Sequence, residues 1–161
     1  MATIIVENGS IVTGANSYVT EAELATYASD RGITISGTEA VLIIQAMDYV
    51  ENLEFIGIKT EEDQPLQWPR YDAVVDNYLI DSDAIPQLLK DGQMEACLAI
   101  DAGNDPLANV ARQTKKEKVD VLEVEYMDNA SSKTIVKRIT NKLRKLINGS
   151  VSGISFVVRR G

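Results

Sequence analysis

The best candidates for functional residues in this chain are the closely spaced Lys and Arg at its carboxyl end. Residues 131–161 hold eight Lys and Arg and no Asp or Glu, whereas residues 1–130 hold all 24 acidic residues and the other eight basic residues. The carboxyl-terminal segment therefore carries a net charge of +8 and the rest −16. This asymmetry predicts that the segment binds an anionic partner. Six of the cations lie in one stretch: Lys133, Lys137, Arg138, Lys142, Arg144 and Lys145.

Catalytic and metal-binding chemistry finds little support in the sequence. The chain contains no histidine, which removes the commonest general base and the usual metal ligand. Its one cysteine, Cys97, lies in an apolar run and is expected to be a buried, inert thiol. Gly9 and Gly14 have the spacing of a phosphate-binding loop, but the Lys and the Ser or Thr of such a loop are missing. We therefore expect no enzyme activity, no metal site and no cofactor, although a carboxylate pair acting as acid and base stays open.

Hydrophobic periodicity predicts the helix that positions the cations, over residues 132–147. Its apolar residues recur at three- and four-residue spacing, so one side packs on a core and the cations occupy the other. This stripe consists of Ile135, Ile139, Leu143 and Leu146. The same periodicity predicts three further helices, over residues 21–31, 38–52 and 85–102. Thr20 and Glu23 have the spacing of a capping box, which begins the first of these three.

Two short β elements are also expected. Asn8-Gly9 separates β-branched runs at 3–7 and 10–13 and suits the type I′ turn of an N-terminal hairpin. Residues 118–127 alternate as a central strand, with a change of phase after residue 121 that indicates a bulge or a bend.

The remaining segments complete the expected fold. Residues 55–83 are rich in polar residues and are expected to form a long ordered loop, and residues 154–160 resemble a strand. The expected fold class is mainly α, with about four helices and a small β element made of the N-terminal hairpin, one central strand and the C-terminal strand.

The basic helix has three interpretations at this stage. Its cations could form only a solvated face of a core helix, dock on a protein, or bind the phosphates of single-stranded DNA. Base stacking supplies much of the affinity for single strands, and Phe156 is the one aromatic residue of residues 131–161. The acidic body would also repel phosphate, so a protein partner is favoured. Membrane insertion is not expected, because the apolar stripe lacks Trp and Phe anchors.

Four segments give the chain a resemblance to a known family. They are GANSYVT at 14–20, PLQWPR at 65–70, IPQLLKDGQMEACLAI at 85–100 and KVDVLEVEY at 118–126. In order and spacing they resemble a family of small tailed-phage proteins that are often labelled DnaT-like single-stranded-DNA-binding proteins and are similar in fold to head-tail connector adaptors. The resemblance extends from about Thr3 to Arg160 and rests on scaffold residues rather than on an active-site signature.

This resemblance implies a structural virion protein, an adaptor in the head-tail neck of a tailed phage, made in the host cytoplasm. It implies a homo-oligomeric ring of about twelve subunits that lies below the portal protein and presents a platform to a stopper or tail-completion protein. Packaged DNA would pass through the ring without specific binding, which suits an acidic body. The alternative is a replication-associated protein that binds single-stranded DNA through its basic C-terminal region.

In the adaptor interpretation, residues 1–153 form a single domain and residues 154–161 form a docking tail. The cations of the basic helix are then expected at the subunit or portal interface. The tail is expected to dock on the portal by adding a strand to it. The residues assigned to this role are Ile154, Phe156, Val158, Arg159 and Arg160.

Trp68 and Arg70 have two interpretations. In the first, the indole is buried and pins the loop to the helical core while Pro69 fixes the backbone. In the second, the two residues are exposed and contact a neighbouring subunit, since Trp and Arg are enriched at interface hot spots.

Overall fold

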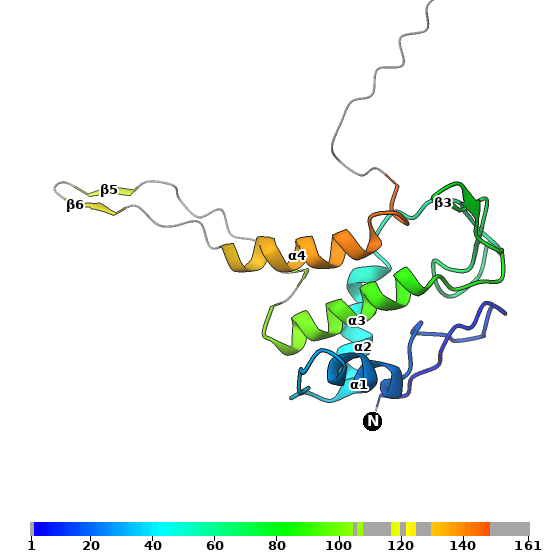
Figure 1. Ribbon diagram of the computed structural model, residues 1–161, viewed down its shortest axis with the longest axis horizontal. Helices are drawn as coiled ribbons and strands as arrows, with labels where there is room; N and C mark the ends of the chain where they lie inside the picture. The colour runs from blue at the N-terminus through cyan, green and yellow to red at the C-terminus, as the bar shows by residue number, and fades with distance from the viewer. Residues whose placement is uncertain (1, 105, 108–116, 120–121, 125–129, 149–161) are drawn as a thin grey trace, which may run out of the picture.

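The part of the chain that the structure describes is built mainly from four helices (Figure 1). The computed structural model describes residues 2–104, 106–107, 117–119, 122–124 and 130–148. Its helix α3 contacts each of the other three, so the core lies around α3. The expected mainly helical class with small β elements is confirmed. In chain order the helices are α1 (Glu21–Ser29), α2 (Glu39–Val50), α3 (Gln87–Asp101) and α4 (Ala130–Leu143).

The predicted capping box begins α1. The Thr20 hydroxyl accepts a hydrogen bond from the Glu23 backbone N–H at 3.1 Å, and the Glu23 carboxylate accepts one from the Thr20 N–H at 2.7 Å. Both bonds satisfy backbone donors that a helix start otherwise leaves unpaired. Gly32, with φ of 65°, follows the helix end as expected.

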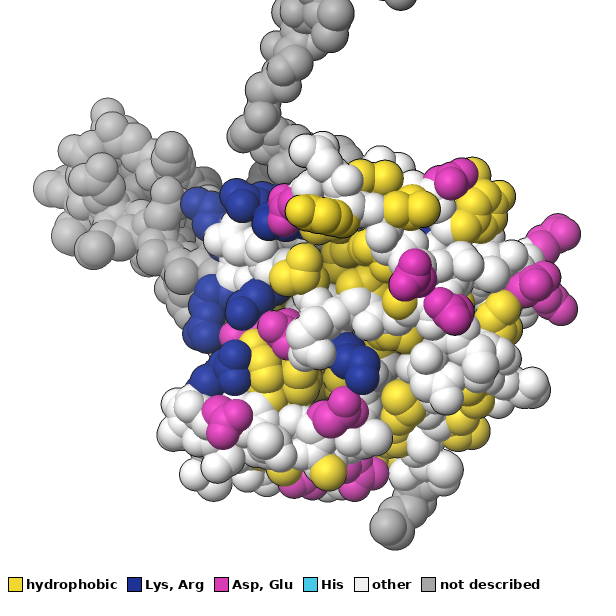
Figure 2. All heavy atoms as spheres, turned by 45° about the vertical axis from the view of Figure 1, so that its right-hand side comes forward, with side chains coloured by type: hydrophobic (Ala, Val, Ile, Leu, Met, Phe, Trp, Pro, Cys, Tyr) yellow, Lys and Arg dark blue, Asp and Glu magenta, His cyan; other side chains and the backbone are white. Residues whose placement is uncertain are grey.

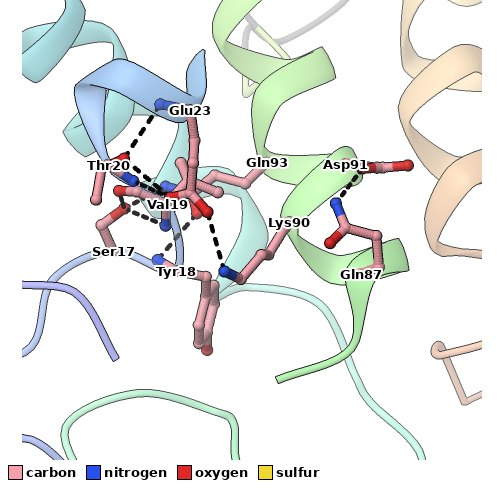
Figure 3. Close-up of polar contacts among 9 residues, drawn as sticks. All are labelled: Ser17, Tyr18, Val19, Thr20, Glu23, Gln87, Lys90, Asp91 and Gln93. Carbon is pink, nitrogen blue, oxygen red and sulfur yellow. Dashed lines mark hydrogen bonds and ion pairs between the residues drawn. The ribbon is translucent and has the colours of Figure 1, made fainter. Parts of the chain in front are cut away.

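Polar contacts join the segment before α1 to α3 (Figure 3). The Gln93 amide oxygen accepts from the Tyr18 N–H at 3.0 Å, and its amide nitrogen donates to the Ser17 hydroxyl at 3.0 Å. Lys90 also donates to Glu23 at 3.1 Å. Because Gln93 is fully buried and both ends of its amide are paired, this contact fixes the approach of the N-terminal segment to α3.

Helices α2 and α3 bury the apolar stripes that the periodicity predicted. Glu51, which follows α2, is half-buried and accepts hydrogen bonds from the Tyr18 hydroxyl and the Gln67 N–H. The Tyr18 hydroxyl also accepts from the Trp68 N–H, so the carboxylate anchors a segment distant in sequence. The buried side chains of the two helices include Leu42, Ile43, Ala46, Met47, Val50, Leu89, Ala96 and Cys97.

The N-terminal hairpin prediction is wrong. Val6 instead forms a parallel bridge with Ser17, and the buried Glu7 carboxylate accepts from the backbone N–H groups of Gly9, Ile11 and Val12 at 2.8 to 3.0 Å. Residues 7–12 therefore curl around a carboxylate rather than pairing as strands. A Cβ at Gly9 would lie 1.6 Å from the carbonyl oxygen of Asp83, so this glycine serves close packing rather than a hairpin turn.

The segment expected to be a long loop contains two short antiparallel strand pairs. Strand β1 (Ile58–Lys59) pairs with β2 (Arg70–Tyr71), and β3 (Val74–Val75) pairs with β4 (Tyr78–Leu79). Asp76 and Asn77 connect β3 to β4 with φ of 52° and 68°, the positive values that a type I′ turn requires at both central residues. The type I′ hairpin turn that was expected at Asn8-Gly9 thus occurs at Asp76-Asn77 instead.

The single central strand is also corrected. Residues Glu117–Val119 form β5 and Leu122–Val124 form β6, an antiparallel pair in which Val119 lies opposite Leu122. The predicted change of phase after residue 121 coincides with this reversal of the chain. The expected C-terminal strand at 154–160 lies outside the described residues, and the division at residue 153 stays a prediction.

Candidate nucleic-acid interface

Residues 137–148, which comprise the end of α4 and the turn after it, have one apolar side and one cationic side. Ile139, Leu143 and Leu146 are fully buried, at the three- and four-residue spacing that the sequence predicted. This burial turns the intervening cations away from the core. The cations whose side chains are described are Lys137, Arg138, Lys142, Arg144 and Lys145.

A glycine brings α3 and α4 close together. A Cβ built at Gly92 would lie 2.3 Å from Cδ2 and 2.5 Å from Cγ of Leu143, distances that atoms do not occupy without movement. The absence of a side chain at Gly92 therefore makes room for Leu143. This close approach brings the cations of α4 within reach of acidic side chains on α3.

Three of these cations form ion pairs with acidic residues elsewhere in the protein: two on α4 and one in the turn after it. Arg138 lies 3.1 Å from the Glu95 carboxylate, and Lys142 lies 4.0 Å from that of Asp91, both on α3. Lys145 contacts Asp76 in the β3–β4 turn. The side chains of these cations keep between 39 and 61% of their surface exposed, so their charges are screened by water and these pairs contribute little to stability.

Lys137 and Arg144 differ from the other three cations. Both are exposed, and no acidic partner of either is found within the described part of the chain. They are therefore available to an external anion without the loss of an internal ion pair.

Glu95 is the most enclosed acid of this region, and it contacts Tyr27, Arg31 and Arg138. Its carboxylate accepts from the Tyr27 hydroxyl at 3.0 Å and lies 3.9 Å from Arg31, whose guanidinium also covers the Tyr27 ring at 3.3 Å from the centroid. Burial and the neighbouring carboxylate raise the pKa of the Tyr27 hydroxyl, so it stays a neutral donor. With Arg138 also bound, Glu95 holds elements together rather than offering a free acid or base.

Trp68 and Arg70 lie inside the fold. The Trp68 indole has no exposed surface and meets the Phe55 ring edge-on, with centroids 6.0 Å apart. Arg70 donates to the backbone oxygens of Ile56 and Gly57 at 2.7 and 2.8 Å, and burial lowers its pKa. These contacts support the interpretation of a loop anchor; a contact with another subunit stays an untested prediction.

Among the described residues, neither a candidate metal cluster nor an exposed thiol is found. No group of three potential metal-ligating residues is found among them, and none of their helices is long and apolar enough to cross a membrane. Cys97 is buried, as predicted, and burial raises the pKa of its thiol to about 12. The thiolate that a nucleophile requires is therefore not populated at neutral pH.

The remaining sequence-predicted residues lie where nothing is described. These are the Lys133 side chain and the tail residues Ile154, Phe156, Val158, Arg159 and Arg160. The structure thus brings together five of the six cations that the sequence placed on the basic helix, three on α4 and two in the turn after it, and leaves the tail untested.

Sequence reasoning missed one exposed aromatic residue beside the cations. Tyr78 on β4 is 78% exposed, and the β3–β4 turn that precedes it contacts Lys145 through Asp76. The only local signal was the pair of turn residues Asp76 and Asn77, which indicated neither the exposure of Tyr78 nor its neighbour.

Comparison with known proteins gives a family but no relative of known structure. No curated protein and no solved structure matches the chain. A family model described as "Putative DnaT-like ssDNA binding protein" matches residues 2–161.

The match corrects the functional expectation. The head-tail adaptor interpretation is wrong, because the matching family is described by single-stranded-DNA binding and not by a structural role in a phage neck. The expected ring, portal and tail-completion partners and the virion location came from that interpretation and stay untested predictions. The label that accompanied the resemblance is confirmed: this chain belongs to the family described as "Putative DnaT-like ssDNA binding protein".

Proposed function

We propose that this protein binds single-stranded DNA through the exposed cations of α4 and of the turn after it. The observation that carries the proposal is the outward direction of five cations, three on α4 and two directly after it, while Ile139, Leu143 and Leu146 fasten the same segment to the core. A rigid helix that presents several cations at once is suited to successive phosphates of a strand. The description of the family supports the same ligand.

The charge of the rest of the chain confines the DNA to this face. Residues 1–130 carry a net charge of −16, which repels a polyanion from most of the surface. The described part of residues 131–161 contains cations and no acid. Association should therefore be local, oriented and strongly dependent on salt.

The internal ion pairs set the expected size of the salt dependence. Each phosphate neutralised on a single strand contributes about −0.7 to the slope of log K against log salt. Contacts from Lys137 and Arg144 alone predict a slope of about −1.4. If Arg138, Lys142 and Lys145 also exchange their acids for phosphates, the slope approaches about −3.5.

The test is fluorescence anisotropy with a labelled oligothymidylate across a range of salt concentrations. Lys137→Gln with Arg144→Gln removes the two cations without described acidic partners and keeps helix-compatible side chains. We expect this double variant to lose at least about tenfold in affinity near 50 mM salt, and its slope to become shallower by about 1.4.

Lys90→Gln provides the matched control. It removes one positive charge, as each of the two substitutions in the double variant does, but from a lysine of α3 that donates to Glu23 of α1 (Figure 3). Its affinity should remain within about twofold of the wild type. Absence of oligothymidylate binding by the wild type, or equal losses in the control and the α4 variants, would contradict the proposal.

A further inference from the structure

The β3–β4 ribbon exposes apolar side chains that a folded domain usually covers. Tyr78 is 78% exposed, Leu79 is 65% exposed and Val74 is 52% exposed. The strand register pairs Val75 with Tyr78 and Val74 with Leu79, so Tyr78 and Leu79 lie on opposite faces of the ribbon. The tyrosine ring is therefore available to a ligand on one face only.

One printed contact links this ribbon to the turn after α4. Asp76, two residues before Tyr78, contacts Lys145, which directly follows Arg144. The same turn also meets the segment before β1, because Ile56 donates to the Leu146 carbonyl at 2.9 Å and Phe55 forms a bridge with Ile147. Figure 2 shows Lys and Arg side chains at one side of this face of the molecule and hydrophobic side chains gathered across its top.

An exposed aromatic ring beside cations matches the two chemical features of a single DNA strand. The phosphates require positive charge, and the unpaired bases offer flat faces that stack on aromatic side chains. A duplex offers the same phosphates but hides its base faces in the stack. The tyrosine can therefore distinguish the two forms of DNA, whereas the cations alone cannot.

We propose that Tyr78 stacks on a base of single-stranded DNA whose phosphates are held by Arg144 and Lys145, and that this contact gives preference for single strands over duplex. The inference rests on the proposed function of the α4 cations and adds the residue that determines specificity. The positive charge that attracts a polyanion to this site comes from Arg144 and Lys145, because the ribbon and its flanks carry acids only: Asp72, Asp76, Asp81 and Asp83. Lys145 has three N–H donors, so it can bind a phosphate while it keeps the contact with Asp76 that links it to the ribbon.

The experiment compares Tyr78→Ala, Tyr78→Phe and Leu79→Ala for binding to oligothymidylate and to a duplex of equal length. We expect Tyr78→Ala to weaken single-strand binding at least about fivefold, with an unchanged salt slope because no charge is lost. Tyr78→Phe keeps the ring and should bind as the wild type does. Leu79→Ala removes an apolar side chain that is also mostly exposed, from the opposite face, and should also have no effect. Duplex affinity should be the same in all four proteins.

The outcomes separate this inference from the proposed function. If Lys137→Gln with Arg144→Gln weakens binding and Tyr78→Ala does not, the stacking contact is refuted while DNA binding by α4 stands. If Leu79→Ala weakens binding as much as Tyr78→Ala, the ribbon acts as a general apolar surface and the assignment to Tyr78 fails. If the wild type binds no oligothymidylate, both proposals fail. Because Tyr78 is mostly exposed, its replacement should leave the unfolding midpoint unchanged, which thermal denaturation checks.

Discussion

The close contact between α3 and α4 makes Gly92→Ala the most direct test of how the cationic helix is held. The new methyl group would lie 2.3 Å from Cδ2 and 2.5 Å from Cγ of Leu143. Leu143 is fully buried, so its side chain has no free space into which to rotate. The substitution must therefore move α4 away from α3 or distort the packing around Leu143.

Two opposing effects decide the size of the change. Alanine favours the helix interior over glycine by about 1 kcal/mol. Overpacking of a filled core costs about 1–3 kcal/mol. Because two atoms of the leucine are approached, we place the cost at the upper end and expect Gly92→Ala to lower the free energy of unfolding by about 1–2 kcal/mol.

A double-mutant cycle identifies the cause. Leu143→Ala alone should cost about 2–5 kcal/mol through the lost burial and the cavity. In the double variant the clash is absent and the new methyl group fills part of that cavity, so its loss should be smaller than the sum of the single losses by at least about 1 kcal/mol. Urea unfolding can be followed by the fluorescence of Trp68, the one tryptophan, which is fully buried.

Leu146 provides the control for this cycle. It is as deeply buried as Leu143, but the atoms nearest to a Cβ at Gly92 all belong to Leu143. Gly92→Ala and Leu146→Ala should therefore be additive within about 0.5 kcal/mol. Additivity for the Leu143 pair as well would refute the close approach of the two helices.

Four further predictions follow from single contacts. Thr20→Ala removes the capping box and should cost about 1 kcal/mol in urea unfolding; an unchanged stability would mean that the cap contributes nothing. Cys97 should resist alkylation at pH 8 until the protein unfolds, because burial raises its pKa to about 12; rapid labelling of the native protein would contradict this. Burial raises the pKa of Glu51 above its ordinary value of 4.5, so the folded state binds this proton more tightly than the unfolded state does. The contribution of Glu51 to stability therefore falls as the pH rises above 4.5. The stability advantage of the wild type over Glu51→Gln should accordingly shrink between pH 4 and pH 7 in urea titrations, and a growing advantage would refute the sign. Asp91→Asn removes the acid 4.0 Å from Lys142 and should tighten oligothymidylate binding up to about fivefold at low salt, whereas weaker binding would show that the acid orients the lysine.

Local signals in the sequence predicted the helices well. The capping box at Thr20 and Glu23 uses residues three apart, and the apolar stripes repeat within each helix, so neither depends on distant parts of the chain. The turn predictions were less successful. Asn8-Gly9 suits a hairpin turn, but the backbone N–H groups of Gly9 and Val12 donate to the Glu7 carboxylate instead of pairing with a neighbouring strand.

The β3–β4 hairpin shows the converse case. Asp76-Asn77 is the turn that adopts two positive φ angles, although it lies in a stretch that the polar composition indicated as a loop. Strands of two residues carry too little alternation to be recognised from sequence, because the period-2 pattern needs about four residues to appear.

The sequence by itself determined the separation of charge and the stripe that turns the α4 cations outward, since both depend only on residue type and helical spacing. Only the tertiary structure decided which cations are paired with the body and which remain open. Lys145 and Asp76 are 69 residues apart in the chain, and their contact links the β3–β4 turn, two residues before Tyr78, to the turn after α4. Such a neighbourhood depends on how the helices pack, and the packing in turn depends on the space that Gly92 leaves for Leu143.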